Sequence, residues 1–366
     1  MRRRRAIPAI AVAAAIPALA AAATARFAIL YRERAGYPTR APVVGHPGGL
    51  GLPWEPVSVP SSGTRLPAWY IPAALSPAAA DGRRPGVVLV HGWGSNRARM
   101  LPIAAFLHAA GFHTLSIDVR GHGENPPETL PVTGVVFGED AAAAAASLAA
   151  RPDVTDVAIL GHSMGGVGAA LAAAAAAAQA EGPAIRAIVL VSAPADPRLL
   201  VRETFRMADL RLPDVVAQPL AWVSLRSVLR PRGHAPRQAS ARRAVAAADA
   251  AVLVVQGDAD EILPLRDLRI LEEAAASRGP AHVTEILVVR GGRHRWLYED
   301  AGFRAAVAGF LARNLAGALA PADASATAAA LAVTRPADTE GSLIPEEAHG
   351  HAHRDRHAPD GPPVRS

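Results

Sequence analysis

Residues 157–166 read Val-Ala-Ile-Leu-Gly-His-Ser-Met-Gly-Gly, and this stretch decides the fold. Four apolar residues typical of a buried strand come first, and an alanine-rich run typical of a helix follows. The Gly-x-Ser-x-Gly spacing between them predicts a sharp strand-to-helix turn, in which side chains two positions either side of the serine would collide. Such a turn lifts the hydroxyl to the C-terminal edge of a sheet, so we predict that Ser163 is a nucleophile.

On either side of this stretch, short apolar runs alternate with helical patterns. Eight strands are predicted, at Val57–Val59, Leu66–Ile71, Val87–Val90, Thr114–Ile117, Val157–Leu160, Ala187–Val191, Val252–Val255 and Glu285–Val289. Helices are predicted near Arg97–Ala110, Glu139–Ala150, Met164–Ala178, Leu265–Ser277 and Asp300–Leu315. The first two strands form a hairpin, and the alternation of strand and helix after Pro85 predicts βαβ units and a parallel sheet. Solid Val, Ile and Leu runs indicate strands that are buried on both faces.

One long segment, residues 196–248, interrupts this alternation. It is too long for an ordinary connection, and it carries Trp222, several prolines and mixed helical patterns. We interpret it as a small helical cap, inserted between two strands of a domain that extends over residues 45–315.

A catalytic serine requires a base, and the base requires a carboxylate to orient it. In folds built on this turn, the chain order is serine, acid, histidine. His294 follows the last predicted strand and Asp260 follows the strand before it, so both lie at the edge where open α/β sheets place ligands. Asp258 and Asp196 also follow strands, and both stay open as alternatives for the acid.

Two backbone amides are predicted to form the oxyanion hole. One belongs to Met164, directly after the serine. The other belongs to Trp93 in the loop His91-Gly92-Trp93-Gly94, where the glycines let the backbone approach the oxyanion closely. We interpret His91 as a residue that fixes this loop and not as a catalyst.

These stretches together resemble the α/β-hydrolase superfamily, and most of all its serine-aminopeptidase-like and esterase-like hydrolases, which often carry an N-terminal membrane segment. The resemblance covers about residues 52–315. It is carried by His-Gly-Trp-Gly at 91–94, Asp-Val-Arg-Gly-His-Gly at 118–123, Gly-His-Ser-Met-Gly-Gly at 161–166, Gly257, Asp260 and Pro264, and Gly292 and His294. The resemblance implies an α/β fold with an eight-stranded, mostly parallel sheet flanked by helices, whose second strand is antiparallel. It also implies a structural role for residues 118–123.

Three functions fit these residues. The first is hydrolysis of a small-molecule carboxylic ester through an acyl-enzyme, without a metal or an organic cofactor. We prefer it because esters are the substrates that a Ser-His-Asp site cleaves most easily. The second is an aminopeptidase-like hydrolase, which needs cap carboxylates such as Glu203 or Asp209 to bind the free amine of its substrate. The third is a non-catalytic scaffold, which the complete set of catalytic residues argues against.

Residues 1–35 are predicted to be a membrane anchor or a signal segment. Four arginines precede the uncharged run Ala6–Ala25, which is long enough as a helix to cross a bilayer. Ala23-Thr24-Ala25 fits a signal cleavage site. The run is mostly alanine with two prolines, so insertion would be marginal, and a soluble arm is the third reading. An anchor or a signal would put the catalytic domain outside the cytoplasmic membrane.

Residues 316–366 are rich in Ala, Pro and His and are predicted to be disordered. A histidine-rich segment can bind metal ions, but we favour a solvated tail without a metal site here.

The chain has no cysteine, which excludes disulfides and a thiolate nucleophile. Its net charge of +6 comes from scattered arginines without a nucleic-acid-binding motif, so we expect no nucleic-acid partner.

Overall fold

The computed structural model describes residues 6–74, 82–179 and 184–333, with side chains from residue 17 onward. Within these residues, eight strands form one sheet in the order β1-β2-β4-β3-β5-β6-β7-β8. The strands are β1 (Glu55–Ser61), β2 (Thr64–Ile71), β3 (Arg84–Val90), β4 (His113–Ile117), β5 (Val154–His162), β6 (Ile185–Val191), β7 (Ala251–Gly257) and β8 (Thr284–Val289). Strand β2 is antiparallel to β1 and β4, and the other neighbours are parallel. The predicted strands and the antiparallel second strand are confirmed.

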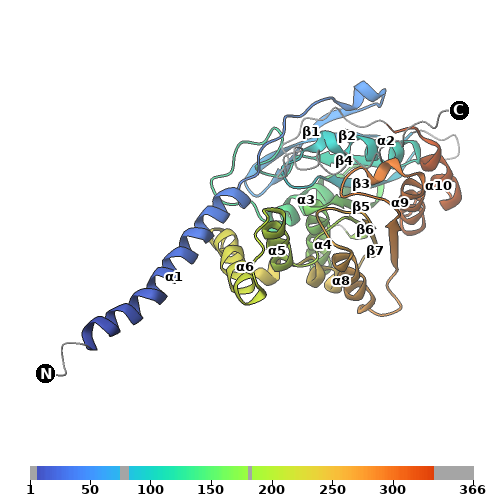
Figure 1. Ribbon diagram of the computed structural model, residues 1–366. Helices are drawn as coiled ribbons and strands as arrows, with labels where there is room; N and C mark the ends of the chain where they lie inside the picture. The colour runs from blue at the N-terminus through green and yellow to red at the C-terminus, as the bar shows by residue number, and fades with distance from the viewer. Residues whose placement is uncertain (1–5, 75–81, 180–183, 334–366) are drawn as a thin grey trace, which may run out of the picture.

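Helices cover both faces of this sheet (Figure 1). The helices are α1 (Ala6–Ala35), α2 (Leu101–Ala109), α3 (Gly134–Ala149), α4 (Met164–Ala177), α5 (Pro197–Met207), α6 (Asp214–Leu229), α7 (Ala241–Ala247), α8 (Leu265–Ala276), α9 (Ala301–Asn314) and α10 (Pro321–Ala330). Short 3-10 helices lie at Pro47–Leu50, Arg97–Met100, Arg230–Arg232, Pro236–Ala239 and Leu297–Glu299. Helices α3, α4, α7 and α8 pack on one face of the sheet, and α2, α9 and α10 pack on the other.

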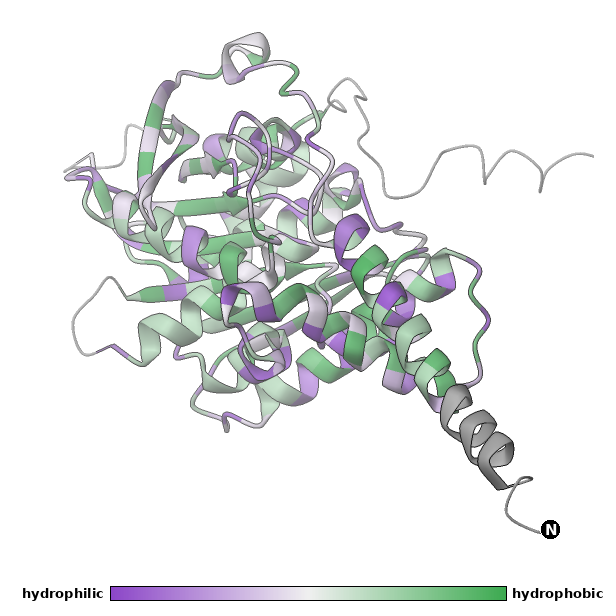
Figure 2. Ribbon diagram, turned by 90° about the vertical axis from the view of Figure 1, so that its left-hand side faces the viewer, coloured by the Kyte–Doolittle hydropathy of each residue, from purple (hydrophilic) through white to green (hydrophobic). Residues whose placement is uncertain are grey.

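The central strands are apolar throughout because both of their faces are buried. In β3, Val88 and Val90 belong to one hydrophobic cluster, while Val87 and Leu89 belong to the cluster on the opposite face. All four side chains are fully buried. Figure 2 shows hydrophobic colouring along the strands in the middle of the domain. A strand covered by helices on both sides has no polar face, which explains the continuous apolar runs in the sequence.

The predicted cap is present, and the end of helix α1 packs against it. Helices α5, α6 and α7 lie between β6 and β7 in the chain. The rings of Phe27 and Tyr31 in α1 meet the ring of Phe205 in α5 edge-on, with centroid distances of 5.6 and 5.8 Å. Figure 1 shows the last turns of α1 beside α6 and the start of α1 extending away from the domain. The last turns of α1 therefore belong to the folded domain, although the sequence assigned them to a separate N-terminal segment.

Among the residues that the structure describes, no helix is both long enough and apolar enough to cross a membrane. The membrane anchor predicted within residues 1–35 is therefore not supported. Alanine dominates this helix, and its small side chain contributes little transfer free energy. The predicted location outside the cytoplasmic membrane stays a prediction.

Helix α10 corrects the prediction of a disordered tail from residue 316. Ala324 and Ala328 are fully buried against the rest of the fold. The guanidinium group of Arg304 in α9 donates to the carbonyls of Ala328 and Ala329, at 2.9 and 2.8 Å. The prediction was wrong here because an alanine-rich helix has no clear amphipathic pattern, although its small side chains allow close docking. The histidines of residues 349–357 lie outside the described residues.

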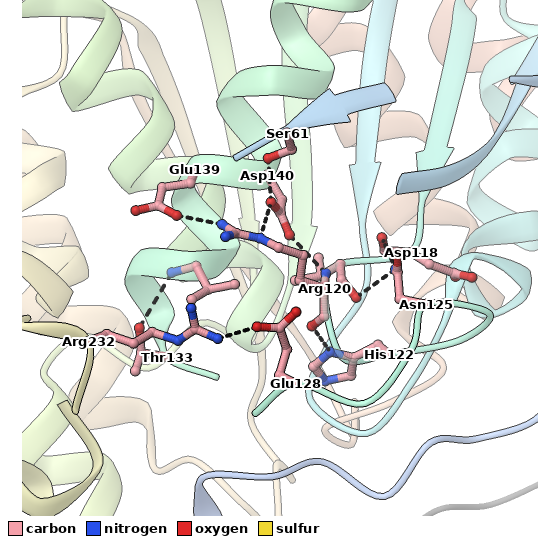
Figure 3. Close-up of polar contacts among 12 residues, drawn as sticks. Ser61, Asp118, Arg120, His122, Asn125, Glu128, Thr133, Glu139, Asp140 and Arg232 are labelled. Atoms are coloured by element: carbon pink, nitrogen blue, oxygen red, sulfur yellow. Dashed lines mark hydrogen bonds and ion pairs between the residues drawn. The ribbon is translucent and has the colours of Figure 1, made fainter. Parts of the chain in front are cut away.

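Buried ion pairs hold the loop that begins at Asp118, directly after β4 (Figure 3). Asp118 is fully buried and accepts hydrogen bonds from the amide of Arg97, at 2.7 Å, and from its guanidinium group. Figure 3 shows Arg120 and Ser61 pointing toward Asp140 of α3. The amide and the Nε of Arg120 donate to the two oxygens of Asp140 at 2.8 Å, and the Ser61 hydroxyl donates at 2.6 Å. These contacts support a structural role for the loop.

Replacing Asp140 by alanine should lower the free energy of unfolding by about 3–5 kcal/mol, because the buried guanidinium group of Arg120 loses its main partner. Glu139→Ala is the matched control. Glu139 also pairs with Arg120, at 2.5 Å, but its side chain is 42% exposed. We therefore expect the control to cost about 1 kcal/mol or less. Chemical denaturation measures both variants, and equal losses would contradict the importance of the buried pair.

Candidate active site

Ser163 lies on the turn between β5 and α4, with φ 54° and ψ −118°. A positive φ strains a residue with a side chain and is typical of functional turns. A Cβ at Gly161 would overlap the carbonyl of Gly165, and a Cβ at Gly165 would overlap the carbonyl of Val90. The amide of Ser163 donates to the carbonyl of Val191 in β6 at 2.8 Å. The turn predicted from the glycine spacing is therefore present, and both glycines are required by contact.

His294 and Asp260 meet at the same edge of the sheet. The Nδ1–H of His294 donates to Oδ2 of Asp260 at 2.9 Å, and both side chains are almost fully buried. The amides of Ile262 and Leu263 donate to Oδ1 of Asp260, at 2.9 and 2.8 Å. Burial acts to raise the pKa of Asp260, but the hydrogen bonds from His294 and the two amides outweigh it and hold the pKa below its usual value. The Nε2 of His294 is left as a proton acceptor.

The two alternative acids are engaged elsewhere. Asp258 is exposed, and its side chain accepts a hydrogen bond from the amide of Gly291 at 2.6 Å. Asp196 caps the start of α5 by accepting from the amide of Arg198 at 2.9 Å. Of the three candidates that the sequence left open, the structure brings Asp260 to the histidine.

The loop after β3 lies against the serine turn. A Cβ at Gly92 would stand only 3.2 Å from the Cβ of Ser163. Met164 is the first residue of α4, where an amide has no partner within the helix. Among the described residues, the Trp93 amide has no protein acceptor. Trp93 thus follows the glycine that lies against Ser163, and Met164 begins the helix that follows Ser163.

His91 fixes the loop after β3, as the sequence predicted. Its side chain is fully buried. The amide of Val119 donates to its Nε2 at 3.1 Å, so the proton is on Nδ1, which donates to the carbonyl of Gly92 at 2.7 Å. Burial lowers the pKa of His91 to about 4, so the ring is neutral at neutral pH.

A cavity of about 750 Å³ lies beside the serine turn, the loop after β3 and His294. Ser163, His294, Trp93 and Met164 all line it. Its other walls come from the cap helices α5 and α6, from helices α1, α2 and α9 and from nearby loops. Most of these side chains are apolar, and Arg34, Arg99 and Arg295 also line the cavity. Within the described part of the chain, no hydrogen bond joins the Ser163 hydroxyl to His294. Catalytic hydrogen bonds of this kind often tighten only when substrate binds.

Two residues that sequence reasoning did not select hold the backbone of His294. The Nε2–H of His162 donates to the carbonyl of His294 at 2.9 Å. Glu261 accepts from the amide of His294 at 3.1 Å. Burial lowers the pKa of His162 to about 3, so its ring is neutral. The only signal in the sequence is their position, directly before Ser163 and directly after Asp260.

Sequence reasoning also missed the residues of α1 that line the cavity. They are Phe27, Leu30, Tyr31, Arg34 and Ala35. Their spacing of three and four residues places them on one face of a helix, which is the signal that was available. The length, the leading arginines and the cleavage-site pattern of the N-terminal segment do not reveal this face.

Comparison with known proteins agrees with this geometry. A family model described as serine aminopeptidase, S33, matches residues 82–231. A monoacylglycerol lipase of Mycolicibacterium smegmatis is 30% identical over 212 residues, covering 52% of this chain and 75% of the lipase. An uncharacterised protein of Mycobacterium tuberculosis is 29% identical over 279 residues, covering 75% of this chain and 85% of that protein. An esterase structure from Pyrococcus furiosus superposes with a TM-score of 0.56 at 18% identity, covering 76% of this chain and 97% of the esterase.

The eight-stranded sheet, its flanking helices and the serine turn are those of the α/β-hydrolase fold. With these relatives, the chain belongs to the serine aminopeptidase-like S33 family of the α/β-hydrolase superfamily. The resemblance stated from the sequence is confirmed. The similarities to these proteins support a hydrolase that is either esterase-like or lipase-like, or peptidase-like.

Proposed function

We propose that this protein is a serine hydrolase that cleaves carboxylic esters. His294 takes the proton of the Ser163 hydroxyl, and the Ser163 oxygen attacks the ester carbonyl carbon. The amides of Trp93 and Met164 stabilise the oxyanion of the tetrahedral intermediate. The intermediate expels the alcohol, which receives its proton from His294, and leaves an acyl group on Ser163. In the second half of the reaction, a water molecule gives a proton to His294 and attacks the acyl carbon. The carboxylic acid is released, and His294 returns the proton to Ser163. Asp260 orients His294 in both halves.

One observation carries the proposal. Ser163 lines the same cavity as His294, and His294 is the residue whose Nδ1 is hydrogen-bonded to Asp260 at 2.9 Å. A nucleophile, a base with its acceptor nitrogen available and a carboxylate that orients the base are the groups that acyl transfer requires.

The charges around the cavity favour an ester over a peptide with a free amine. Among the described residues, no Asp or Glu side chain lines the cavity. Glu203, one candidate for binding an amine, pairs with Arg206 at 2.7 Å and with Arg266 at 3.0 Å. Asp209, the other, is 82% exposed and pairs with Arg211. A positively charged amine in this cavity would lack a carboxylate partner, and leaving a buried charge unpaired is costly.

The second candidate is an aminopeptidase-like hydrolase, which the description of the matching family model favours. We expect p-nitrophenyl butyrate to be hydrolysed with a kcat/KM at least about 100-fold above that of aminoacyl p-nitroanilides, because no carboxylate among the described residues lines the cavity to pair with the amine. N-acetylated anilides are the matched control, since they keep the scissile amide and remove the charge. Faster cleavage of the free-amine anilide than of both the ester and the acetylated anilide would instead establish the aminopeptidase.

A further inference from the structure

Helix α1 contributes a continuous face to the cavity that contains Ser163. Its residues Phe27, Leu30, Tyr31 and Arg34 line this cavity. They are spaced by three and four positions, so they lie along one side of the helix. All four follow the predicted cleavage site at Ala25, so this face is retained whether or not the preceding segment is removed.

The last turns of α1 are held in place by polar contacts as well as by aromatic ones. The Tyr31 hydroxyl is hydrogen-bonded to the Thr204 hydroxyl of α5 at 3.1 Å. The Ser227 hydroxyl of α6 donates to the carbonyl of Ala28 at 2.8 Å. Ala28 is only 4% exposed. Helices α5 and α6 of the cap therefore fix α1, and its inner face forms part of the cavity wall.

The side chains of this wall indicate which kind of ligand it contacts. Phe27 and Tyr31 pack with Phe205 and the apolar residues of the cap in one hydrophobic cluster. Aromatic rings bind apolar chains through a large contact area. A cavity of about 750 Å³ is large enough for a ligand well beyond a short acyl group.

We propose that helix α1 forms one wall of the acyl-binding cavity, and that Phe27 and Tyr31 determine the preference of the enzyme for long, apolar acyl chains. This inference rests on the proposed ester hydrolysis and adds its substrate class, which is esters of medium-chain and long-chain fatty acids. Chains long enough to reach α1 gain contact with the two rings, whereas short acyl groups remain near Ser163 and do not.

The test uses the full chain and p-nitrophenyl esters from butyrate to laurate. We expect Phe27→Ala and Tyr31→Ala each to lower the ratio of laurate to butyrate kcat/KM by about tenfold, because the chain loses part of its apolar contact. The rate with butyrate should fall less than the rate with laurate, because a four-carbon acyl group buries less apolar surface against the cavity wall. Tyr31→Phe keeps the ring and removes only the hydroxyl, so its ratio should match that of the wild type.

Ile29→Ala is the matched control. Ile29 lies on the same helix, is 43% exposed and is absent from the cavity lining. Its ratio should be unchanged. Equal losses on butyrate and laurate in both alanine variants, or the same shift in Ile29→Ala, would overturn the inference.

A binding measurement separates this inference from the proposed function. In the Ser163→Ala background, calorimetry measures the affinity for laurate, the product of the longest ester, without any turnover. Adding Phe27→Ala or Tyr31→Ala should weaken laurate binding by about tenfold, and adding Ile29→Ala should not. If laurate fails to bind, or binds equally to all of these variants, the inference is wrong. Absence of ester turnover in the wild type, together with the expected binding pattern, would instead overturn the proposed function alone.

Discussion

Replacing Ser163 by alanine should lower kcat/KM for p-nitrophenyl butyrate by about 10⁴- to 10⁶-fold. The variant loses the oxygen that forms the acyl-enzyme, so only the oxyanion amides and substrate binding remain to accelerate hydrolysis. Alanine has a side chain at the same strained φ of 54°, and the turn keeps its glycines, so the fold should be retained. Steady-state kinetics gives the loss, and labelling with a fluorophosphonate should modify the wild type and not the variant.

Ser192→Ala is the matched control for this variant. Ser192 follows β6, the strand next to β5, and also has a positive φ, of 47°. Its hydroxyl is buried and has no hydrogen-bond partner among the described residues. Removing it should change kcat/KM by no more than a few fold. Ester turnover by Ser163→Ala within about tenfold of the wild type would exclude the serine mechanism.

The second large effect is expected at the acid. Asp260→Asn should lower kcat/KM by about 10³- to 10⁴-fold. The amide group of asparagine would face Nδ1 of His294 as a donor, so the imidazole would move its proton to Nε2. The nitrogen that should accept the serine proton would then carry a proton of its own. Substrate affinity should change little, so the loss should appear in kcat.

Asp258→Asn is the control that separates the two aspartates. Asp258 is exposed and accepts one hydrogen bond, from the amide of Gly291, which the carbonyl oxygen of asparagine can accept equally well. We expect less than about a threefold change. A larger loss in this variant than in Asp260→Asn would mean that the two roles are exchanged.

The serine turn and the strands were predictable because their physical causes are local. A strand buried on both faces needs apolar residues at every position, so β3 and β5 are visible in the sequence. The turn at Ser163 needs glycines at Gly161 and Gly165, since a Cβ at either position would collide with backbone. Each of these requirements concerns a few consecutive residues.

The acid and the cavity walls were not predictable to the same degree, because they depend on segments far apart in the chain. Asp258 and Asp260 have the same residue type and nearly the same place after β7, and only the path of the loop directs Asp260 toward His294. Phe27 lines the cavity because α1 packs against α5 and α6 of the cap. No local pattern encodes either outcome.

The sequence by itself determined the order of strands and helices, the strained serine turn and the places of Ser163 and His294 after their strands, because chain direction and backbone sterics impose them residue by residue. Only the tertiary structure decided which aspartate orients His294, that the alanine-rich residues 321–330 form a docked helix, and that α1 closes one side of the cavity. Those outcomes follow from packing between segments up to about two hundred residues apart, for which burial energy depends on the partner surface and not on the local sequence.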